Sequence, residues 1–226
     1  MTAVTIASLS LDLRSRFLDG LAPAARKTIL AAAAHRQFFA ETVVTDQGHP
    51  AERLFLLTKG HARHFFVTAD GKKLLLQWLG PGDVIGARTV LSSRSTYLVG
   101  TEVVTDSTVF TWDRTTIRGL IARHPRLLEN ALLVASDYVT WHLTSHIHLA
   151  CYNARQRAVQ VILTLARTLG QKVPGGIALQ ITNEELANAA NVSPFTASRL
   201  ISEWQRNRAL LKRRGGLLLV SAERLV

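Results

Sequence analysis

The stretch TNEELANAANVSPFTASRLISEWQRN, residues 182–207, constrains the fold of this chain more than any other part of its sequence. Thr182 and Glu185 have the spacing of a capping box, in which each side chain accepts a hydrogen bond from the other residue's backbone amide at the start of a helix. Asn191 tolerates the left-handed backbone that ends a short helix. Ser193, followed by a proline, fits the cap of a second helix. The stretch therefore predicts two short helices joined by a tight turn.

Helical periodicity divides these two helices into a buried and an exposed face. The positions predicted to face inward are small or apolar: Leu186, Ala187, Ala190, Ala197, Leu200, Ile201 and Trp204. The outward positions of the second helix, residues 193–206, are Phe195, Thr196, Arg199, Ser202 and Glu203. The segment ALLKRRGGLLLV that follows predicts a β-hairpin whose tip carries Lys212, Arg213 and Arg214. Two helices, a turn and a hairpin with a basic tip are typical of a winged helix-turn-helix.

The net charge of the chain is concentrated in its last third. The formal net charge is +11 over 226 residues, and residues 153–226 hold 11 Lys and Arg against 4 Asp and Glu. A surface that meets the phosphates of a nucleic acid carries such an excess of positive charge. We therefore expect residues 153–226 to bind double-stranded DNA.

In this interpretation the second helix enters a major groove. Ser193 and Thr196 are placed for phosphates, and Arg199 reaches base edges, where a guanidinium can donate two parallel hydrogen bonds to guanine. The hairpin tip adds phosphate contacts that do not depend on sequence. Phe195 cannot hydrogen-bond a base, so it either presses against a thymine methyl group or folds back onto its own domain. The alternatives are an ordinary helical hairpin with a solvated basic face and a protein that compacts DNA without sequence preference.

Residues 37–112 are rich in β-branched and aromatic residues and are punctuated by glycines. Asp70-Gly71 lies between two strand-like runs, and this dipeptide is a strong signal for a hairpin whose two central residues have positive φ. Regularly spaced short strands of this kind predict a small antiparallel barrel or sandwich. A short helical lead over Leu11–Leu30 is expected before them.

From about Arg123 to Ala150 the chain contains no glycine, and its apolar period changes to that of a helix. One stripe consists of Leu128, Leu132, Ala135, Val139, His142, His146 and Leu149. The adjacent stripe consists of Leu127, Ala131, Val134, Tyr138, Trp141 and Ser145. We expect one stripe to pack on the barrel and the other on the same helix of a second copy, which makes this helix a dimer seam. An amphipathic helix from about Asn153 to Gly170 and a loop around Pro174 then lead to the quoted stretch.

Several classes of protein are excluded by what the sequence lacks. It contains no basic start with an apolar run and a cleavage site, and no apolar stretch of membrane-spanning length, so we expect a soluble cytoplasmic protein without membrane contact. Cys151 is the only cysteine, which rules out an internal disulfide and a four-cysteine zinc or iron–sulfur site within one chain. Cys151 and His148 lack the oxyanion turn and orienting carboxylate of a nucleophilic enzyme, and HExxH, GxSxG and phosphate-binding glycine-rich motifs do not occur. We therefore do not expect an enzyme.

Two long segments resemble one known family. ITNEELANAANVSPFTASRLISEWQRNRALLKRRGGLLLV is similar to the DNA-binding domain of the CRP/FNR superfamily of bacterial transcription regulators, and GHPAERLFLLTKGHARHFFVTADGKKLLLQWLGPGDVIGA resembles its cyclic-nucleotide-binding-type β-roll. The glycines at the family's turns are Gly48, Gly60, Gly71, Gly82 and Gly86. The resemblance covers nearly the whole chain and implies an α+β fold in three parts. These are an effector-sensing, jelly-roll-like antiparallel β-roll with short N-terminal helices (1–122), a dimerisation helix with a hinge (123–152) and a winged helix-turn-helix (153–226).

The resemblance also implies roles for single residues of the second helix. Ser193, Thr196 and Arg199 match the family pattern Ser-x-x-Thr-x-x-Arg, which implies phosphate and base contacts for them. The two positions between Ser193 and Thr196 are usually polar base readers and here are Pro194 and Phe195. The operator is therefore expected to differ from those of the best-known members, while remaining a palindrome because the reader is a homodimer. RNA polymerase is a further partner if the protein is an activator.

The implied effector pocket departs more sharply from the family pattern. The family's cyclic-AMP binders use Gly-Glu for the ribose and Arg-Ser or Arg-Thr for the cyclic phosphate, whereas this chain has Gly86-Ala87-Arg88 and, at the arginine position, Tyr97. Because the carboxylate and the arginine are both absent, we expect an effector other than cAMP. The single cysteine also argues against an Fe–S cluster. Arg88 or Arg94 is a candidate for holding another anion.

Eight histidines supply the remaining candidate chemistry. His142 and His146 lie one turn apart on one face of the long helix, near where the family's helix closes over the effector. Such a pair can bind haem iron or a divalent metal or titrate as a pH switch; the alternative is polar packing. Three alternatives for regulation are therefore open: binding of a small-molecule effector, haem-based sensing of CO, NO or O2, and a collapsed pocket with constitutive DNA binding. In a regulated protein, the effector would shift the long helices and reorient the two helices that carry Arg199.

Overall fold

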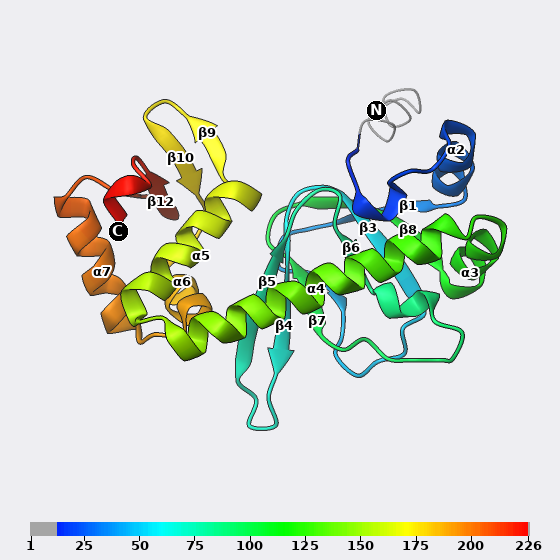
Figure 1. Cartoon of the computed structure of the whole chain (residues 1–226), viewed down its shortest axis with the longest axis horizontal. Coiled ribbons are helices and arrows are strands. Elements are labelled where there is room, and N and C mark those ends of the chain that lie inside the picture. The colour runs from blue at the N-terminus through cyan, green and yellow to red at the C-terminus, as the bar shows by residue number, and fades with distance from the viewer. Residues whose placement is uncertain (1–12, 226) are drawn as a thin grey trace. The chain divides into compact units, whose positions relative to one another are not determined.

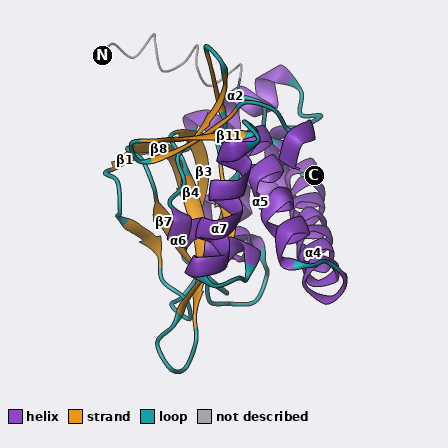
Figure 2. Ribbon diagram, turned by 90° about the vertical axis from the view of Figure 1, so that its left-hand side faces the viewer, coloured by secondary structure: helices purple, strands orange, loops and turns teal. Residues whose placement is uncertain are grey.

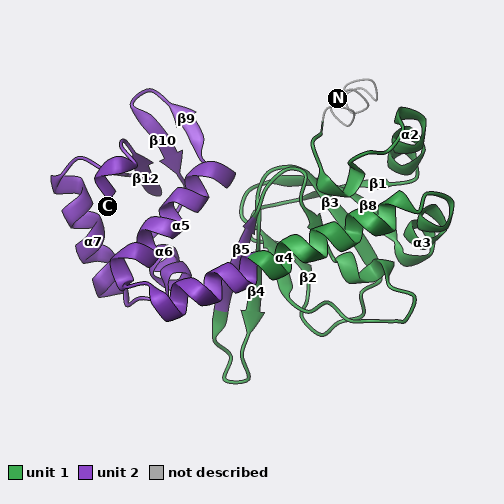
Figure 3. Cartoon of the chain, viewed as in Figure 1, with its two compact units in different colours: residues 1–73, 79–140 green, residues 74–78, 141–226 purple. Residues whose placement is uncertain are grey.

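The computed structural model describes residues 13–225 of the chain (Figure 1). Their contacts divide the chain into two compact units (Figure 3). Unit 1 comprises the described residues up to Lys73 together with Leu79–Thr140, and unit 2 comprises Leu74–Trp78 together with residues from Trp141 onward. The three-part division expected from the sequence stays a prediction.

Residues 34–113 form antiparallel sheets, whose strands are orange in Figure 2. Within the described residues, two four-stranded sheets have the strand orders β1-β8-β3-β6 and β2-β7-β4-β5. The strands are β1 Ala34–Phe38, β2 Val43–Thr45, β3 Arg53–Lys59, β4 Ala62–Val67, β5 Lys73–Leu79, β6 Val84–Ile85, β7 Gly100–Val103 and β8 Ser107–Asp113. The helical elements up to the end of the long helix are η1 Arg16–Leu18, α2 Pro23–Ala31, η2 Ala87–Val90, α3 Arg114–Arg123 and α4 Arg126–Cys151. This order confirms the predicted antiparallel β-roll followed by a long helix.

Strand β3 explains how unit 1 encloses its core. Its side chains alternate between two faces, so Leu54 and Leu56 join one buried cluster while Phe55 and Leu57 join another. The first cluster contains side chains of η1, α2, α3 and α4 and includes the buried Trp112 of β8. The second cluster contains side chains from strands of both sheets. Because β3 is buried on both faces, its sequence is a continuous apolar run rather than an alternating one.

The hairpin expected at Asp70-Gly71 forms, but its turn is longer than the predicted two residues. Strands β4 and β5 are neighbours joined by residues 68–72, and the amide of Thr68 donates to the carbonyl oxygen of Lys72 at 3.0 Å. Among the two central residues only Gly71 has a positive φ, at 83°. The turn is therefore closed by Thr68 and Lys72, and Gly71 alone supplies the left-handed backbone.

The helical lead expected over Leu11–Leu30 is wrong in its extent. Residues 11 and 12 lie outside the described part of the chain. The following residues form the short 3-10 turn η1, a break at Gly20 with φ 68°, and then α2 with Pro23 at its first position. Proline is favoured at that position because the first amide of a helix has no intrahelical partner. The sequence thus predicted a helix here but placed its start too early.

The two predicted stripes of α4 have different environments. Leu127 and Ala131 are buried in the core of unit 1. Leu132 and Val139 are 70% and 67% exposed. One face of α4 is therefore covered by the β-roll, and the adjacent face carries uncovered apolar side chains. Within residues 13–225, none of the helices is both long and apolar enough to span a membrane.

Unit 2 contains the predicted winged helix-turn-helix. Its helical elements after α4 are α5 Ala154–Thr168, α6 Asn183–Ala190, α7 Pro194–Arg206 and η3 Glu223–Leu225. Its strands are β9 Gln171–Val173, β10 Gly176–Leu179, β11 Leu210–Arg213 and β12 Gly216–Leu219, in the sheet order β11-β12-β10-β9. The wing is the hairpin β11–β12, as predicted. The sequence predicted only a loop around Pro174, but β9 and β10 form a second hairpin there. The sequence did not indicate these strands because strands this short produce no recognisable alternation.

Candidate nucleic-acid interface and effector region

The start of α6 and the turn to α7 have the conformations that their sequence predicts. The amide of Thr182 donates to Glu185 Oε2 at 2.8 Å, and the amide of Glu185 donates to Thr182 Oγ1 at 3.1 Å. Asn191 has the left-handed backbone, with φ 49°. Ser193 caps α7 by accepting a hydrogen bond from the amide of Thr196 at 3.1 Å. These bonds fix the direction in which α7 leaves the turn.

Burial fixes the rotation of α7 about its axis. Ala197, Leu200, Ile201 and Trp204 are all buried, as predicted. The indole Nε1 of Trp204 also donates to the carbonyl oxygen of Leu225 at 2.9 Å. Turning α7 would expose this apolar face to water, at a cost of about 25 cal/mol for each Å² uncovered. The opposite face is therefore presented to solvent in one orientation.

The outward face of α7 carries the predicted DNA contacts. Phe195 is 80% exposed, which excludes the alternative that its ring folds back onto its own domain. Arg199 and Ser202 are also exposed, and Thr196 is half buried. Within the described part of the chain, the Arg199 guanidinium forms no hydrogen bond or ion pair. It is therefore available to a partner, although its role in DNA binding stays a prediction.

The hydroxyl groups of this face are partly engaged within the helix. The Oγ atoms of Ser193 and Thr196 are 2.9 Å apart, so one hydroxyl donates to the other. The Ser202 hydroxyl donates to the carbonyl oxygen of Ser198 at 2.9 Å. One hydroxyl hydrogen of the Ser193–Thr196 pair remains for an external acceptor, because two hydroxyls supply two donors and their mutual bond uses one.

The wing presents the three predicted cations. Lys212 and Arg213 belong to β11, and Arg214 and Gly215 form the turn to β12. All three basic residues are exposed, whereas the leucines of β12 are buried in the core of unit 2. Gly215 has φ 76°, a conformation that residues with a β-carbon rarely adopt. The buried strand thus anchors a tip that consists of charged side chains.

Arg157 of α5 connects the end of α4 to the helix-turn-helix and was not predicted from the sequence. Its guanidinium donates to the carbonyl oxygens of Tyr152, Ala190 and Asn191 at 2.7, 2.8 and 3.1 Å. Tyr152 follows the last residue of α4, Ala190 is the last residue of α6, and Asn191 begins the turn to α7. A local pattern could not have indicated this link, because two of the three acceptors lie 33 and 34 residues away.

Arg155, the second residue of α5, binds α7 directly. Its Nη1 lies 2.7 Å from Glu203 Oε1, and its guanidinium lies over the ring of Trp204 at 5.7 Å. The hydrogen bond from Arg155 lowers the pKa of Glu203. Water screens the charges of an ion pair at the protein surface, so the main effect of this pair is to fix the position of α5 against α7. Glu203, expected on the free outward face, is in fact tied to α5.

The β-roll residues implied as effector contacts lie on the segment 86–97. Gly86 has φ 78°, and a β-carbon there would lie 2.8 Å from Cε1 of Tyr97. The Tyr97 hydroxyl donates to the carbonyl oxygen of Arg53 at 2.8 Å and accepts from the Arg53 amide at 3.1 Å, and burial raises the pKa of Tyr97. Ala87 packs against the core of unit 1, and Arg88 is half buried. Tyr97 thus ties its loop to β3.

A chain of polar groups joins the sheet β2-β7-β4-β5 to α4 within unit 1. Nδ1 of His64 lies 2.9 Å from Thr101 Oγ1, and its Nε2 lies 2.9 Å from the Tyr138 hydroxyl oxygen. The Thr45 hydroxyl donates to Thr101 Oγ1 at 2.8 Å, and the Tyr138 hydroxyl donates to the Val84 carbonyl oxygen at 3.3 Å. Burial of the hydroxyl raises the pKa of Tyr138, although the residue as a whole is only half buried. These groups occupy the interior between the sheet and the helix.

The predicted histidine pair lies on α4 and is exposed. Both His142 and His146 face solvent in the single chain. Within residues 13–225, no group of three or more His, Cys, Asp or Glu side chains could hold a metal ion. A haem or metal role for the pair stays a prediction. Of the β-roll histidines, His64 is the one bonded to α4, and nothing in its sequence context distinguished it from His49 and His61.

Two family models match the chain along the regions described above. Residues 35–124 match the cyclic nucleotide-binding domain, which spans most of the β-roll. Residues 156–226 match the Crp-like helix-turn-helix domain, which spans nearly all of α5 and the rest of unit 2 beyond it. Together the two models match well over half of the chain.

Individual relatives are similar to this chain over most of its length. The chain is 24% identical over 182 residues to a CRP-like cAMP-activated global transcriptional regulator of Mycobacterium tuberculosis, with 79% of this chain and 80% of that protein covered. The solved structure of the c-di-GMP responsive global regulator CLP of Xanthomonas campestris has a TM-score of 0.76 and 20% identity, covering 88% of this chain and 100% of that one. FixK2 from Bradyrhizobium japonicum has a TM-score of 0.74 and 18% identity, covering 85% and 95%. At these identities the solved structures share the fold.

Proposed function

Because this chain belongs to the CRP/FNR superfamily of bacterial transcription regulators, we propose that it binds a palindromic DNA operator as a homodimer, with α7 of each copy in a major groove. Membership makes it a CRP-like DNA-binding transcription regulator and not an enzyme. The palindrome follows from the two-fold symmetry of a dimer. The observation that supports the proposal most directly is the exposed outward face of α7 on a helix whose other face is buried.

Two side chains near the start of α7 are the proposed base readers. The Arg199 guanidinium, which has no hydrogen bond or ion pair within the described residues, can donate two parallel hydrogen bonds to guanine, for roughly 1–3 kcal/mol of discrimination. Phe195 lies one turn earlier on the same face and offers an apolar ring for a thymine methyl group. Each half of the operator should therefore contain a guanine and a nearby thymine.

Contacts that do not read sequence are proposed around these two residues. Ser193 and Thr196 lie at the N-terminus of α7, where backbone amides and the helix dipole favour a phosphate. Ser202 lies further along the helix, and the three cations of the wing extend the basic surface. Each neutralised phosphate adds about 0.9 to the slope of log affinity against log salt. Binding should therefore weaken strongly as salt rises.

The uncovered stripe of α4 supports the homodimer. Its large apolar members with exposed side chains are Leu128, Leu132, Val139 and Leu149. The helix has 26 residues, and its stripe follows the 4-3 spacing that allows the same stripe of a second copy to pack knobs into holes. Pairing of two α4 helices would remove these side chains from water and bring two copies of α7 to one DNA duplex.

For the effector, we propose a molecule other than cyclic AMP. The names of relatives give different effectors: the Mycobacterium tuberculosis protein is cAMP-activated and CLP is c-di-GMP responsive. In this chain Ala87 packs into the core and the Tyr97 hydroxyl is bonded to Arg53. Neither residue supplies the carboxylate or the guanidinium that the family's cyclic-AMP binders use. Haem-based gas sensing through His142 and His146 is the alternative, and a Soret band that shifts with carbon monoxide would support it.

Arg157 provides a route by which a movement at the end of α4 would reach the DNA reader. Its guanidinium binds Tyr152 on one side and the turn before α7 on the other. A change of backbone angle at residues 151–153 would therefore carry α5 and the helix-turn-helix as one body. We propose that effector-dependent movement of α4 alters the spacing of the two α7 helices in this way.

Selection of binding sites from a pool of random DNA duplexes tests the proposed function. The full-length protein should enrich a palindrome with a guanine and a thymine in each half, and should bind it at least about 10³-fold more tightly than unrelated DNA of equal length. The affinity should be measured at two salt concentrations. Absence of an enriched sequence, with affinity set by salt alone, would instead indicate a non-specific DNA-compacting protein.

A further inference from the structure

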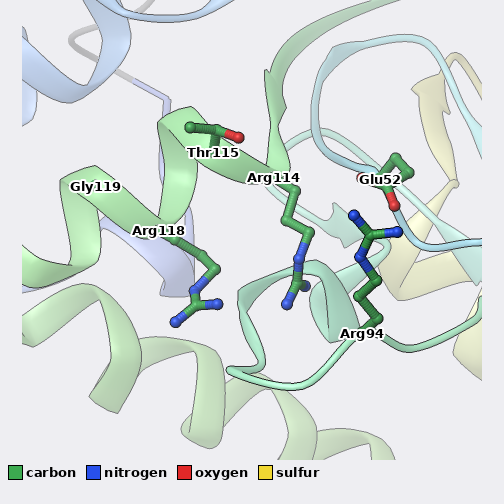
Figure 4. A pocket seen from close by; sticks show the side chains of 6 residues that line it. All are labelled: Glu52, Arg94, Arg114, Thr115, Arg118 and Gly119. Atoms are coloured by element: carbon green, nitrogen blue, oxygen red, sulfur yellow. The ribbon is translucent and has the colours of Figure 1, made fainter.

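Unit 1 has a hollow of about 450 Å³ on its surface that gathers three arginines (Figure 4). Its lining residues are Glu52, Arg94, Arg114, Thr115, Arg118 and Gly119. Arg114 and Arg118 come from α3, and Arg94 comes from the loop between η2 and β7. The volume falls in the range of about 300–1,000 Å³ that is usual for small-molecule sites. Of these residues, only Arg94 was a candidate anion contact in the sequence; the residues of α3 were not predicted.

The two arginines of α3 are held in place by the loop. Arg114 donates to the carbonyl oxygens of Thr89, Leu91, Ser92 and Ser93 at distances between 2.8 and 3.0 Å. Arg118 Nη1 donates to the carbonyl oxygen of Ser92 at 2.9 Å. The remaining N–H groups of Arg118 face no acceptor among the described residues. Because these side chains are already ordered, they lose little conformational entropy when they bind a ligand.

The described part of the chain does not neutralise the charge of the three arginines. Among residues 13–225, neither Arg94 nor the two arginines of α3 form an ion pair with a carboxylate. Glu52 is the single acidic side chain of the lining, so the pocket is positive in net. Guanidinium groups match the oxygens of a phosphate with paired hydrogen bonds and are more weakly hydrated than ammonium groups. The lining therefore favours an anion with several oxygens.

We propose that this pocket binds a small phosphate ester that carries a hydroxyl group, such as a glycerol phosphate or a sugar phosphate. The phosphate group lies between Arg94 of the loop and Arg118 of α3. The organic part fills the space that a bare phosphate would leave empty, and Glu52 accepts a hydrogen bond from its hydroxyl group. The ligand thus bridges the loop and the helix.

Such a ligand would fix the loop between η2 and β7. The loop is tied at its start by Arg114 and near its end by Tyr97, whose hydroxyl is bonded to Arg53. A bridge from Arg94 to α3 would restrain the part between them. That this restraint affects DNA binding rests on the proposed function, whereas binding of the phosphate ester does not.

Isothermal titration calorimetry on the full-length protein without DNA tests the site. Glycerol 3-phosphate is titrated at pH 7.5 and constant ionic strength into the wild type, the double variant R94Q/R118Q and the control R36Q. Arg36 is an exposed arginine of β1 and lies outside the lining. We expect about one ligand per chain for the wild type and R36Q, and an affinity at least tenfold lower for R94Q/R118Q. Thermal unfolding checks that each variant is folded, and R94Q alone replaces the double variant if the latter is not.

The comparison of variants decides the outcome, because the cations of unit 2 also attract anions. Equal affinity of the wild type and R94Q/R118Q, or heat no different from a sodium chloride control, would overturn the site. Inorganic phosphate should bind more weakly than the ester; equal binding would contradict the ester and leave free phosphate as the ligand. Succinate should bind at least tenfold more weakly, and equal binding of succinate would overturn the assignment to phosphate.

Discussion

The outward face of α7 and the segment 86–97 of the β-roll differ in whether the side chains at their predicted functional positions are free or bound within the chain. On α7, Phe195 is exposed, and Arg199 forms no hydrogen bond or ion pair within residues 13–225. In the β-roll, the Tyr97 hydroxyl has two bonds to Arg53, and Ala87 lies against the core. The outward face of α7 is therefore available to a partner, while Ala87 and Tyr97 are engaged in internal contacts. We expect an effector to act through a movement of the helices or through another site.

The largest expected effect comes from charging the uncovered face of α4 with Val139→Glu. Val139 is 67% exposed, so the chain should still fold, but a carboxylate would be buried without a partner in the paired helices. We expect monomers in sedimentation equilibrium and an operator affinity at least about 100-fold lower, because the two half-sites are no longer linked. Thr144→Glu adds the same charge on the side of the helix away from Val139 and should leave the dimer intact. A dimeric Val139→Glu protein would contradict the seam.

The link between the end of α4 and the reader is broken by Arg157→Gln. This change removes a charged donor from three carbonyl oxygens, so the free energy of unfolding should fall by about 2 kcal/mol. If Arg157 also positions α7, operator affinity should fall about tenfold although no DNA contact is altered. Arg167→Gln, an exposed arginine of the same helix, is the control. Lower stability in urea with unchanged operator affinity would show that Arg157 stabilises the fold but does not position α7 for DNA binding.

Glu102→Gln tests the contribution of an ion-pair network inside the β-roll to stability. Glu102 of β7 is paired with Arg63 of β4 and Lys73 of β5. Burial raises the pKa of Glu102, but the hydrogen bonds and charges of Lys73 and Arg63 outweigh burial and hold the pKa below its usual value of 4.5. A lowered pKa means that the stabilisation is present above pH 4.5 and is lost as the pH falls through the folded-state value. Because Lys73 and Arg63 are partly exposed and screened by water, Glu102→Gln should lower the free energy of unfolding by about 1–2 kcal/mol at pH 7, and by progressively less in acid.

Denaturant unfolding at a series of pH values measures this effect. A difference between wild type and Glu102→Gln that stays constant from pH 7 to strongly acidic conditions would mean that packing, and not the charge of the carboxylate, is responsible.

The smallest expected effect is that of Phe195→Ala. Because the ring is exposed, the free energy of unfolding should change by no more than about 0.5 kcal/mol. Replacing the operator thymine that faces it by uracil removes one methyl group and should cost the wild type about 0.8 kcal/mol. The same replacement should cost Phe195→Ala nothing. Equal sensitivity of both proteins to uracil would show that the ring does not touch the methyl group.

Features set by residues close together in the sequence could be predicted, and features set by contacts between distant residues could not. The helix-turn-helix was predictable because each of its determinants is local: Thr182 and Glu185 are three residues apart, and Ser193 caps the helix that it precedes. The buried and uncovered stripes of α4 follow from a helical period alone. By contrast, the bonds of Arg157 and of His64 join residues that are distant in sequence, and only the folded chain brings them together.

The short elements were not predicted correctly for a different reason. Strands β9 and β10 have three and four residues, too few to produce an alternating pattern. The turn at residues 68–72 formed around Thr68 and Lys72 because the side chain and the backbone of Thr68 both bond to Lys72, which the Asp-Gly dipeptide did not indicate. Tertiary and side-chain contacts thus decided the details that local patterns left open.

We propose that α7 reads DNA through Arg199. The most direct test measures the affinities of the wild type and Arg199→Ala for the selected operator and for operators with single base-pair changes. The wild type should lose about 1–3 kcal/mol when the guanine facing Arg199 is replaced, and Arg199→Ala should be indifferent at that position while keeping its discrimination elsewhere. A uniform loss of affinity on every sequence would contradict the claim, because it would mean that the arginine contacts only phosphate.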